Sequence, residues 1–208
     1  MNAAVRAWLL ALLAVAVWVL SVRLSQPHRA LDASAPVTVF SSTRAQAMLA
    51  RVLGPEKPHP LSSAESAAVR TRILQQFAAL GLPARTYQAF TCNTWRGFGF
   101  IPCATVTDII AEVLPGQGRA IVMMAHYDSV PAGPGASDDA TGVATVLEAA
   151  RALKASPATR VHPVMALITD GEEAGLLGAN AFLQNGSLKQ RVGAVINVDE
   201  RGTGGSTL

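Results

Sequence analysis

The sequence lacks any block of basic residues. Its 17 lysines and arginines are scattered along 208 residues, and the aromatic residues, which make up 5% of the chain, do not interleave with them. Nucleic-acid-binding surfaces usually combine clustered positive charge with stacking side chains, so we expect no nucleic-acid partner. The chain also shows no internal repeat or low-complexity tract. A chain of this length can bury one sizeable core, which predicts one main domain.

Cysteine is scarce, since Cys92 and Cys103 are the only two in the chain. Neither belongs to a Cys-x-x-Cys pair or has a neighbouring histidine, which argues against a zinc site made from these two residues. They flank a segment that is rich in glycine, tryptophan and phenylalanine. In an oxidising compartment the two residues could form a disulfide, and the alternative is a pair of unrelated thiols.

Charged side chains are absent from residues 7–22, which Arg6 and Arg23 flank. This apolar stretch is slightly shorter than the roughly 20 residues that cross a bilayer, and it also fits the apolar region of a signal peptide. The nearest small-x-small cleavage site, Ala33-Ser34-Ala35, lies too far downstream for ordinary processing. We therefore favour an uncleaved membrane anchor over a cleaved signal peptide or a buried soluble helix.

This interpretation divides the chain into three parts. Residues 1–24 would be the transmembrane signal anchor, residues 25–40 a linker, and residues 41–208 the main domain. The domain would lie on the exported side of the membrane, in the periplasm, in the lumen of an organelle or outside the cell, where a disulfide can persist.

The pattern of apolar residues predicts an α/β domain. Helical spacing, serine or threonine caps and a following glycine predict helices over residues 41–53 and 62–80. Short apolar runs predict strands, first over 84–91 and 105–114, and then over 120–125, 163–169 and 192–198, with helices over 139–154 and 173–184 between the last three. Alternating strands and helices imply parallel pairing with helices on both faces. We therefore expect a three-layer α/β/α domain with a mostly parallel central sheet.

A histidine and several acidic residues follow the three core strands. His126 and Asp128 end the first of these strands at a spacing of two, so their side chains project to the same side. A histidine that binds a metal needs its other ring nitrogen held, and Asp128 could do this. The alternative is a hydrogen-bonded histidine with no metal. Open α/β sheets place their ligand sites at the carboxyl ends of the parallel strands, where these two residues lie.

Two acidic pairs and a further aspartate come after the histidine. Asp138-Asp139 follow a loop of glycine and proline, where carboxylates are ordinary helix caps, but a carboxylate here could instead bridge two cations. Glu172-Glu173 follow the second strand and could merely stabilise a helix dipole; alternatively one ligates a metal and the other takes a proton from water. Asp199 ends the third strand, where it could simply be solvated.

The order of these residues resembles one family. Residues 125–142 (AHYDSVPAGPGASDDATG), 169–178 (TDGEEAGLLG) and 197–205 (NVDERGTGG) resemble the metal-binding blocks of the M28 zinc aminopeptidases. The resemblance covers residues 105–205. The arrangement with a membrane anchor is similar to that of the endoplasmic-reticulum metallopeptidase-like branch of the family. The resemblance implies a zinc-dependent exopeptidase fold, peptide substrates, and two Zn2+ ions in a complete site.

The resemblance also implies a role for each matching residue. His126 and Asp199 would ligate the first zinc, Asp138 would bridge both zincs, and Glu173 would ligate the second. Two zincs of this kind share a water, polarise the scissile carbonyl and anchor the substrate.

Two further residues would act beside the metal ligands. Glu172 would be the general base that takes the proton from water and delivers it to the leaving amine. Asp128 would orient the histidine. Asp139 would follow the bridging ligand across an unusual peptide geometry.

The sequence departs from the family pattern after Asp199. The family has a further histidine on the second zinc, and no histidine follows His162. We therefore interpret the chain as a C-terminally truncated member with an incomplete sheet, and we expect weak zinc retention at the second site. The alternatives are a catalytically inactive binding ectodomain and a glutaminyl-cyclase-like acyl transferase, a group that tends to lack the acid at Asp139. The sequence predicts neither the oligomeric state nor the residue preferred in the substrate.

Overall fold

The computed structural model describes residues 2–25, 30–95, 97, 99–157 and 161–199. Residues 26–29 of the expected linker lie outside the described residues, and so do residues 200–208, which include residues 200–205 of the third family-like block. The chain divides into a unit that contains α1 (Ala3–Leu24) and a second unit formed by residues 31–202. The helix α1 has a mean hydropathy of 2.2 and buries none of its residues, so its length and composition would allow it to cross a membrane.

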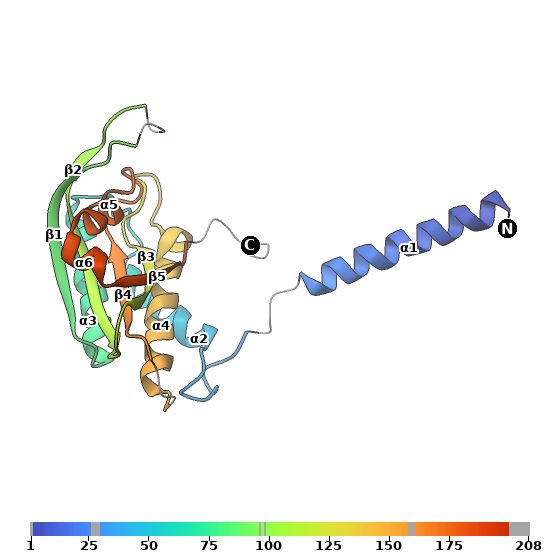
Figure 1. Ribbon diagram of the computed structural model, residues 1–208, viewed down its shortest axis with the longest axis horizontal. Helices are drawn as coiled ribbons and strands as arrows, with labels where there is room; N and C mark the ends of the chain where they lie inside the picture. The colour runs from blue at the N-terminus through green and yellow to red at the C-terminus, as the bar shows by residue number, and fades with distance from the viewer. Residues whose placement is uncertain (1, 26–29, 96, 98, 158–160, 200–208) are drawn as a thin grey trace. The chain divides into compact units, whose positions relative to one another are not determined.

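The second unit is built on a five-stranded sheet (Figure 1). In chain order the strands are β1 (Ala84–Cys92), β2 (Cys103–Leu114), β3 (Ala120–His126), β4 (Val164–Thr169) and β5 (Val192–Asn197), and in space they are ordered β1-β2-β4-β3-β5. β3 pairs in parallel with β4 and with β5, as the alternation of strands and helices predicts. β1 and β2 form an antiparallel hairpin, and β2 is also antiparallel to β4. The parallel half of the sheet carries the acidic clusters.

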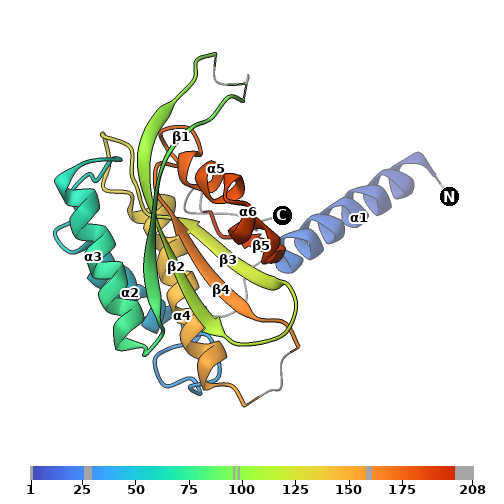
Figure 2. The same ribbon diagram turned by 60° about the vertical axis from the view of Figure 1, so that its left-hand side comes forward.

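Helices cover both faces of this sheet, which confirms the expected three layers (Figure 2). α2 (Ser42–Leu53), α3 (Ala64–Ala79) and α4 (Thr141–Ala155) lie on one face, and α5 (Leu177–Gln184) and the short α6 (Gly186–Gln190) on the other. Alternate residues of β4 separate the two cores, because successive side chains of a strand point to opposite faces. Ala166 and Ile168 pack in the α2–α4 core, whereas Met165 and Leu167 pack with Phe182 of α5.

Residues 31–40, expected to form part of the linker, are hydrogen-bonded to the domain. Arg44 of α2 and Arg151 of α4 donate to backbone carbonyl groups of residues 33–39. Both guanidinium groups also pair with Glu148, whose side chain is fully buried and accepts the backbone N–H of Ser41. This charge cluster fastens the segment to the later part of α4.

β5 is more exposed than the sequence predicts. Its apolar run favours a buried strand, yet Val195 and Ile196 are about half exposed, at 49% and 55%. Within the described part of the chain β3 is its only strand neighbour, so one edge of β5 and much of its surface face solvent.

Candidate metal centre

The predicted site residues lie at the carboxyl ends of β3, β4 and β5. His126 is the last residue of β3 and is buried. Glu172 and Glu173 follow the end of β4 at Thr169, and Asp199 follows the end of β5 at Asn197. Because these three strands are parallel neighbours, their carboxyl ends meet at one edge of the sheet.

The imidazole of His126 is held on both sides. Its Nδ1 lies 3.1 Å from the backbone carbonyl oxygen of Asp128 and 3.5 Å from the carboxylate of the same residue. Its Nε2 lies 3.0 Å from Oδ1 of Asp138 and 3.9 Å from Oε2 of Glu172. A histidine held through Nδ1 presents the Nε2 lone pair in a fixed direction, which is the arrangement a metal ligand needs.

The Asp138-Asp139 pair does not form the ordinary start of a helix. A five-residue π-helical turn, η2 (Ala136–Ala140), precedes α4, and both aspartates have non-helical backbone angles within it. The peptide bond between them is cis. The buried carboxylate of Asp139 accepts the backbone N–H groups of Gly142 and His126, so it caps α4 and ties the helix to the end of β3. Asp138 is left to face the imidazole.

Asp128 positions the segment that carries the two glutamates. Its buried carboxylate accepts the backbone N–H of Glu172 at 2.9 Å and that of Glu173 at 3.1 Å. Because these N–H groups bond to Asp128, and because Gly175 and Leu176 have positive φ values of 115° and 58°, residues 172–176 form turns. The prediction of a helix from residue 173 is therefore wrong in its first turns, and α5 begins at Leu177.

Three side chains could hold one metal ion. Ligand atoms of His126, Asp138 and Asp199 all lie within 4.8 Å of one another. Two ligands of a tetrahedral zinc lie roughly 3.3 Å apart when each bond is about 2.0 Å long, and the 3.0 Å between Nε2 of His126 and Oδ1 of Asp138 is close to this spacing. One nitrogen and two carboxylate oxygens also suit zinc chemically. Glu173 is exposed and lies outside this group. Partial burial raises the pKa of its carboxyl, and the nearby charge of Asp138 raises it further.

The negative charge of the site shifts the protonation of its residues. Burial raises the pKa of Glu172, and the charges of Asp199 and Glu173 raise it further. Burial also raises the pKa of Asp139, to about 7. Burial alone would lower the pKa of His126, but its interaction with Asp128 and the charges of Asp139 and Glu172 outweigh burial and raise it to about 10. A bound cation would relieve this accumulation of like charge.

A further acidic pair, which the sequence pattern did not single out, lies next to the glutamate segment (residues 172–176). Asp108 of β2 and Asp170 are buried, and the backbone N–H of Asp170 donates to Oδ1 of Asp108 at 3.0 Å. Among the residues that the structure describes, Oδ2 of Asp108 and Oδ1 of Asp170 are buried and have no hydrogen-bond partner. Burial and the charge of the other carboxyl raise the pKa of Asp108 to about 7, and burial raises that of Asp170 to about 6. A lone aspartate within an apolar strand gives no sequence signal of such a pairing.

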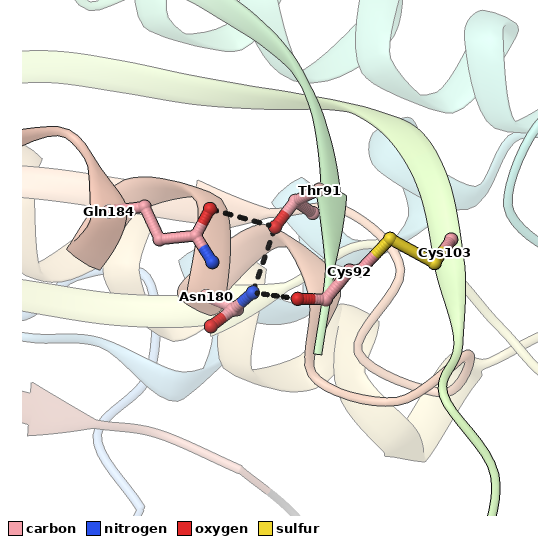
Figure 3. The surroundings of a disulfide bond; sticks show 5 residues. All are labelled: Thr91, Cys92, Cys103, Asn180 and Gln184. Carbon is pink, nitrogen blue, oxygen red and sulfur yellow. Dashed lines mark hydrogen bonds between the residues drawn. A yellow bond between two sulfur atoms is a disulfide. The ribbon is translucent and has the colours of Figure 1, made fainter. Parts of the chain in front are cut away.

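The cysteine pair closes the β1–β2 hairpin. Cys92 and Cys103 face each other in the strand register and form a disulfide, the first of the two alternatives that the sequence left open (Figure 3). Asn180 of α5 donates to the hydroxyl of Thr91 at 2.8 Å and to the carbonyl of Cys92 at 3.0 Å. The hairpin is therefore held against the helix that follows the glutamate segment.

Comparison with known proteins gives a consistent family. Residues 108–208 match the model of Peptidase family M28. Endoplasmic reticulum metallopeptidase 1 of Mus musculus is 35% identical over 105 residues, which is 50% of this chain and 12% of that protein. The vacuolar membrane protease of Schizosaccharomyces pombe is 31% identical over 160 residues, 73% of this chain and 19% of that protein. The chain thus spans less than a fifth of the length of either relative.

Solved structures share the fold. A zinc aminopeptidase from Bacillus subtilis superposes with a TM-score of 0.67 at 15% identity, covering 81% of this chain and 71% of that one. A glutaminyl cyclase from Porphyromonas gingivalis superposes with a TM-score of 0.64 at 22% identity, covering 77% of this chain and 59% of that one. The zinc-dependent exopeptidase architecture expected from the sequence is therefore present.

Proposed function

We propose that the chain carries part of the active site of a zinc-dependent aminopeptidase, because residues 108–208 match the model of Peptidase family M28. The observation that supports this most directly is the convergence of His126, Asp138 and Asp199 at the carboxyl edge of the parallel strands, with Glu172 beside them. The substrate would be a peptide with a free N-terminus.

We assign the first zinc to His126, Asp138 and Asp199. Asp138 would also face a second zinc, for which Glu173 supplies a further carboxylate. When bound, zinc supplies Lewis-acid polarisation of the scissile carbonyl and makes a water molecule easier to deprotonate. Asp128 acts as a positioning residue, since it holds the imidazole through Nδ1 and the backbone of both glutamates.

Glu172 is the group we assign to proton transfer. Its side chain is partly buried, at 29% exposed, and burial raises its pKa, so it holds a proton more readily than a solvated glutamate. As general base it would accept the proton from the attacking water. As the resulting acid it would return that proton to the nitrogen of the leaving amine.

We also propose that the domain is anchored in a membrane on the exported side. α1 provides a helix long enough to span the bilayer, and the relatives named above are proteins of the endoplasmic reticulum and of a vacuolar membrane. The Cys92–Cys103 disulfide fits an oxidising compartment.

Metal content per chain tests the proposed site. The full chain, purified in detergent, should retain zinc after dialysis, and Asp138→Asn should lose most of it because a ligand carboxylate becomes a weakly binding amide. Glu112→Gln is the matched control, since Glu112 is exposed at the other end of the sheet and pairs with Arg191. Zinc content that is the same in all three proteins would overturn the assignment.

Product analysis separates the two enzyme classes that share this fold. Zinc-loaded protein is incubated with a peptide that begins with alanine and with one that begins with glutamine. Release of the first residue supports the aminopeptidase. Loss of ammonia with formation of pyroglutamate would instead favour the glutaminyl-cyclase-like transferase, and folded protein that binds no zinc would favour the binding ectodomain.

A further inference from the structure

The β1–β2 hairpin overhangs the edge of the sheet that carries the metal centre. β2 pairs with β4 only from Ile109, opposite Ile168, to its end. β4 ends one residue later, at Thr169, which lies level with Asp108. The five residues of β2 that precede Asp108 therefore extend beyond the carboxyl end of β4, by roughly 17 Å at about 3.4 Å per residue. Figures 1 and 2 both show this hairpin projecting past the other strands.

The tip of the hairpin presents apolar side chains to solvent. Trp95, Phe100 and Ile101 are 62%, 66% and 63% exposed. The segment between Cys92 and Cys103 contains no acidic residue. Several large apolar side chains gathered on one closed loop mark an interaction surface more often than scattered ones do.

The hairpin tip is connected directly to the glutamate segment through Asn93. Its side-chain amide donates to the carbonyl of Gly175 at 3.0 Å, and its Oδ1 accepts the backbone N–H of Trp95 at 3.1 Å. Its own backbone N–H donates to the carbonyl of Pro102, which closes the base of the tip beyond the disulfide. The Asn93 side chain therefore fixes the backbone of Trp95 relative to the glutamate segment, residues 172–176.

Chain geometry limits how far the tip lies from the reacting groups. Trp95 follows Asn93 by two residues and Gly175 follows Glu173 by two, so the two ends of this path are at most about 25 Å apart, with Cα atoms 3.8 Å apart along the chain. An extended peptide covers that distance in about seven or eight residues.

We propose that the hairpin tip, made of Trp95, Phe100 and Ile101, binds apolar side chains of the peptide substrate downstream of the bond that is cleaved. The tip would make the enzyme prefer peptides with apolar residues after the first two positions. This inference rests on the proposed aminopeptidase function for its ligand, and on the contact between Asn93 and Gly175 for its location.

A lipid surface suits the tip less well than a peptide. The segment that leads from α1 into the domain is fastened by Glu148 and Arg151, in the later part of α4. α4 begins beside the metal centre, where Asp139 caps it, so residues 31–40 join the domain away from the edge that the tip overhangs.

Fluorescence of Trp95 tests the proposal without requiring turnover. Trp8 and Trp18 are replaced by phenylalanine, which leaves Trp95 as the sole tryptophan of the full chain in lipid nanodiscs. The probes are two octapeptides with a free N-terminus, one carrying leucines from the third position and one carrying serines there. The leucine peptide should shift the Trp95 emission to shorter wavelength and bind about ten-fold more tightly, as partial burial of one or two large side chains provides.

Variants separate the tip from the rest of the hairpin. Phe100→Ala with Ile101→Ala should reduce the ten-fold preference to about two-fold. Asn93→Asp should also reduce it, because a carboxylate cannot donate to the Gly175 carbonyl. Phe90→Ala is the control, since Phe90 is 70% exposed on β1 but lies outside the tip, and it should keep the preference.

Several results would overturn the proposal. Equal affinity for the two octapeptides would do so, and so would an equal loss of preference in Phe90→Ala. Quenching of Trp95 by brominated lipid in the nanodisc, without a response to peptide, would assign the tip to the bilayer instead. Failure of the proposed aminopeptidase function would give a different result. Zinc-loaded protein would then release no N-terminal residue, although its Trp95 emission still distinguished the two octapeptides.

Discussion

Replacing Asp108 by asparagine should stabilise the domain at alkaline pH. The carboxyl group is fully buried, and burial together with the charges of Asp170 and Asp128 raises its pKa from 3.8 to about 7. The unfolded chain would ionise near 3.8, so the folded protein binds the proton more tightly between these two values. Stability therefore falls as the pH rises through that window and then levels off above about 7. A rise of this size corresponds to about 4 kcal/mol, at about 1.4 kcal/mol per pKa unit.

Asparagine removes this penalty while keeping the local hydrogen bond. Its Oδ1 can still accept the backbone N–H of Asp170, as the aspartate does at 3.0 Å. Its amide group also replaces Asp108 Oδ2, which is buried and has no hydrogen-bond partner in the described part of the chain, by a donor. At pH 8 we therefore expect Asp108→Asn to exceed the wild type in unfolding free energy by as much as about 4 kcal/mol, and at pH 4.5 by only about 1 kcal/mol.

The assay is urea unfolding of the full chain in detergent, followed by circular dichroism at pH 4.5 and pH 8. Asp108→Ala is the control, because it removes both the charge and the acceptor for Asp170, and should be destabilised at the acidic pH. If Asp108→Asn showed the same loss of stability with rising pH as the wild type, the charge of Asp108 would not be the cause.

Three further predictions concern stability. Gly178→Ala should cost about 2 kcal/mol or more in urea unfolding, because a β-carbon would collide with the Asp108 carboxylate and the backbone of Asp170; Gly186→Ala, where a β-carbon meets no atom within 4 Å, should have little effect. Glu148→Gln should lower the unfolding free energy by about 3 kcal/mol, because two guanidinium groups lose their shared buried carboxylate. It should also speed proteolysis within residues 31–40, and an unchanged cleavage rate would contradict the role of the Arg44–Glu148–Arg151 cluster. The double variant Cys92→Ser with Cys103→Ser should have an unfolding free energy lower by roughly 2–3 kcal/mol, as expected for the loss of a disulfide across 11 residues. A reducing agent should lower the unfolding free energy of the wild type only.

The order of elements was predictable because it depends on local patterns. Apolar periodicity placed the strands and helices near their observed positions, and Ser41 caps α2 as its place in the sequence suggests. The position of β2 between β1 and β4 was less accessible, since an alternating apolar run fits a parallel or an antiparallel neighbour equally well.

Helix starts at the site were predicted less accurately than elsewhere. Glu173 looked like a first-turn residue because acidic residues favour helix N-termini. The carboxylate of Asp128, which is 45 residues earlier in the chain, binds the Glu173 backbone N–H, and α5 begins only at Leu177. Local preference was overridden by a contact that no window of sequence contains.

The sequence alone determined which residues follow the ends of the parallel strands, because strand ends, glycine-rich loops and acidic pairs are written in short stretches of chain. These stretches resemble the metal-binding blocks of the M28 family, and that resemblance implied the zinc ligands and the candidate base. Only the tertiary structure decided how these groups meet: that His126 is held between Asp128 and Asp138, that Asp108 and Asp170 are buried together, and that Asn93 of the disulfide-closed hairpin bonds to Gly175 beside the two glutamates. Such contacts join segments that lie far apart in the chain, and they form only when the sheet order and register bring those segments together.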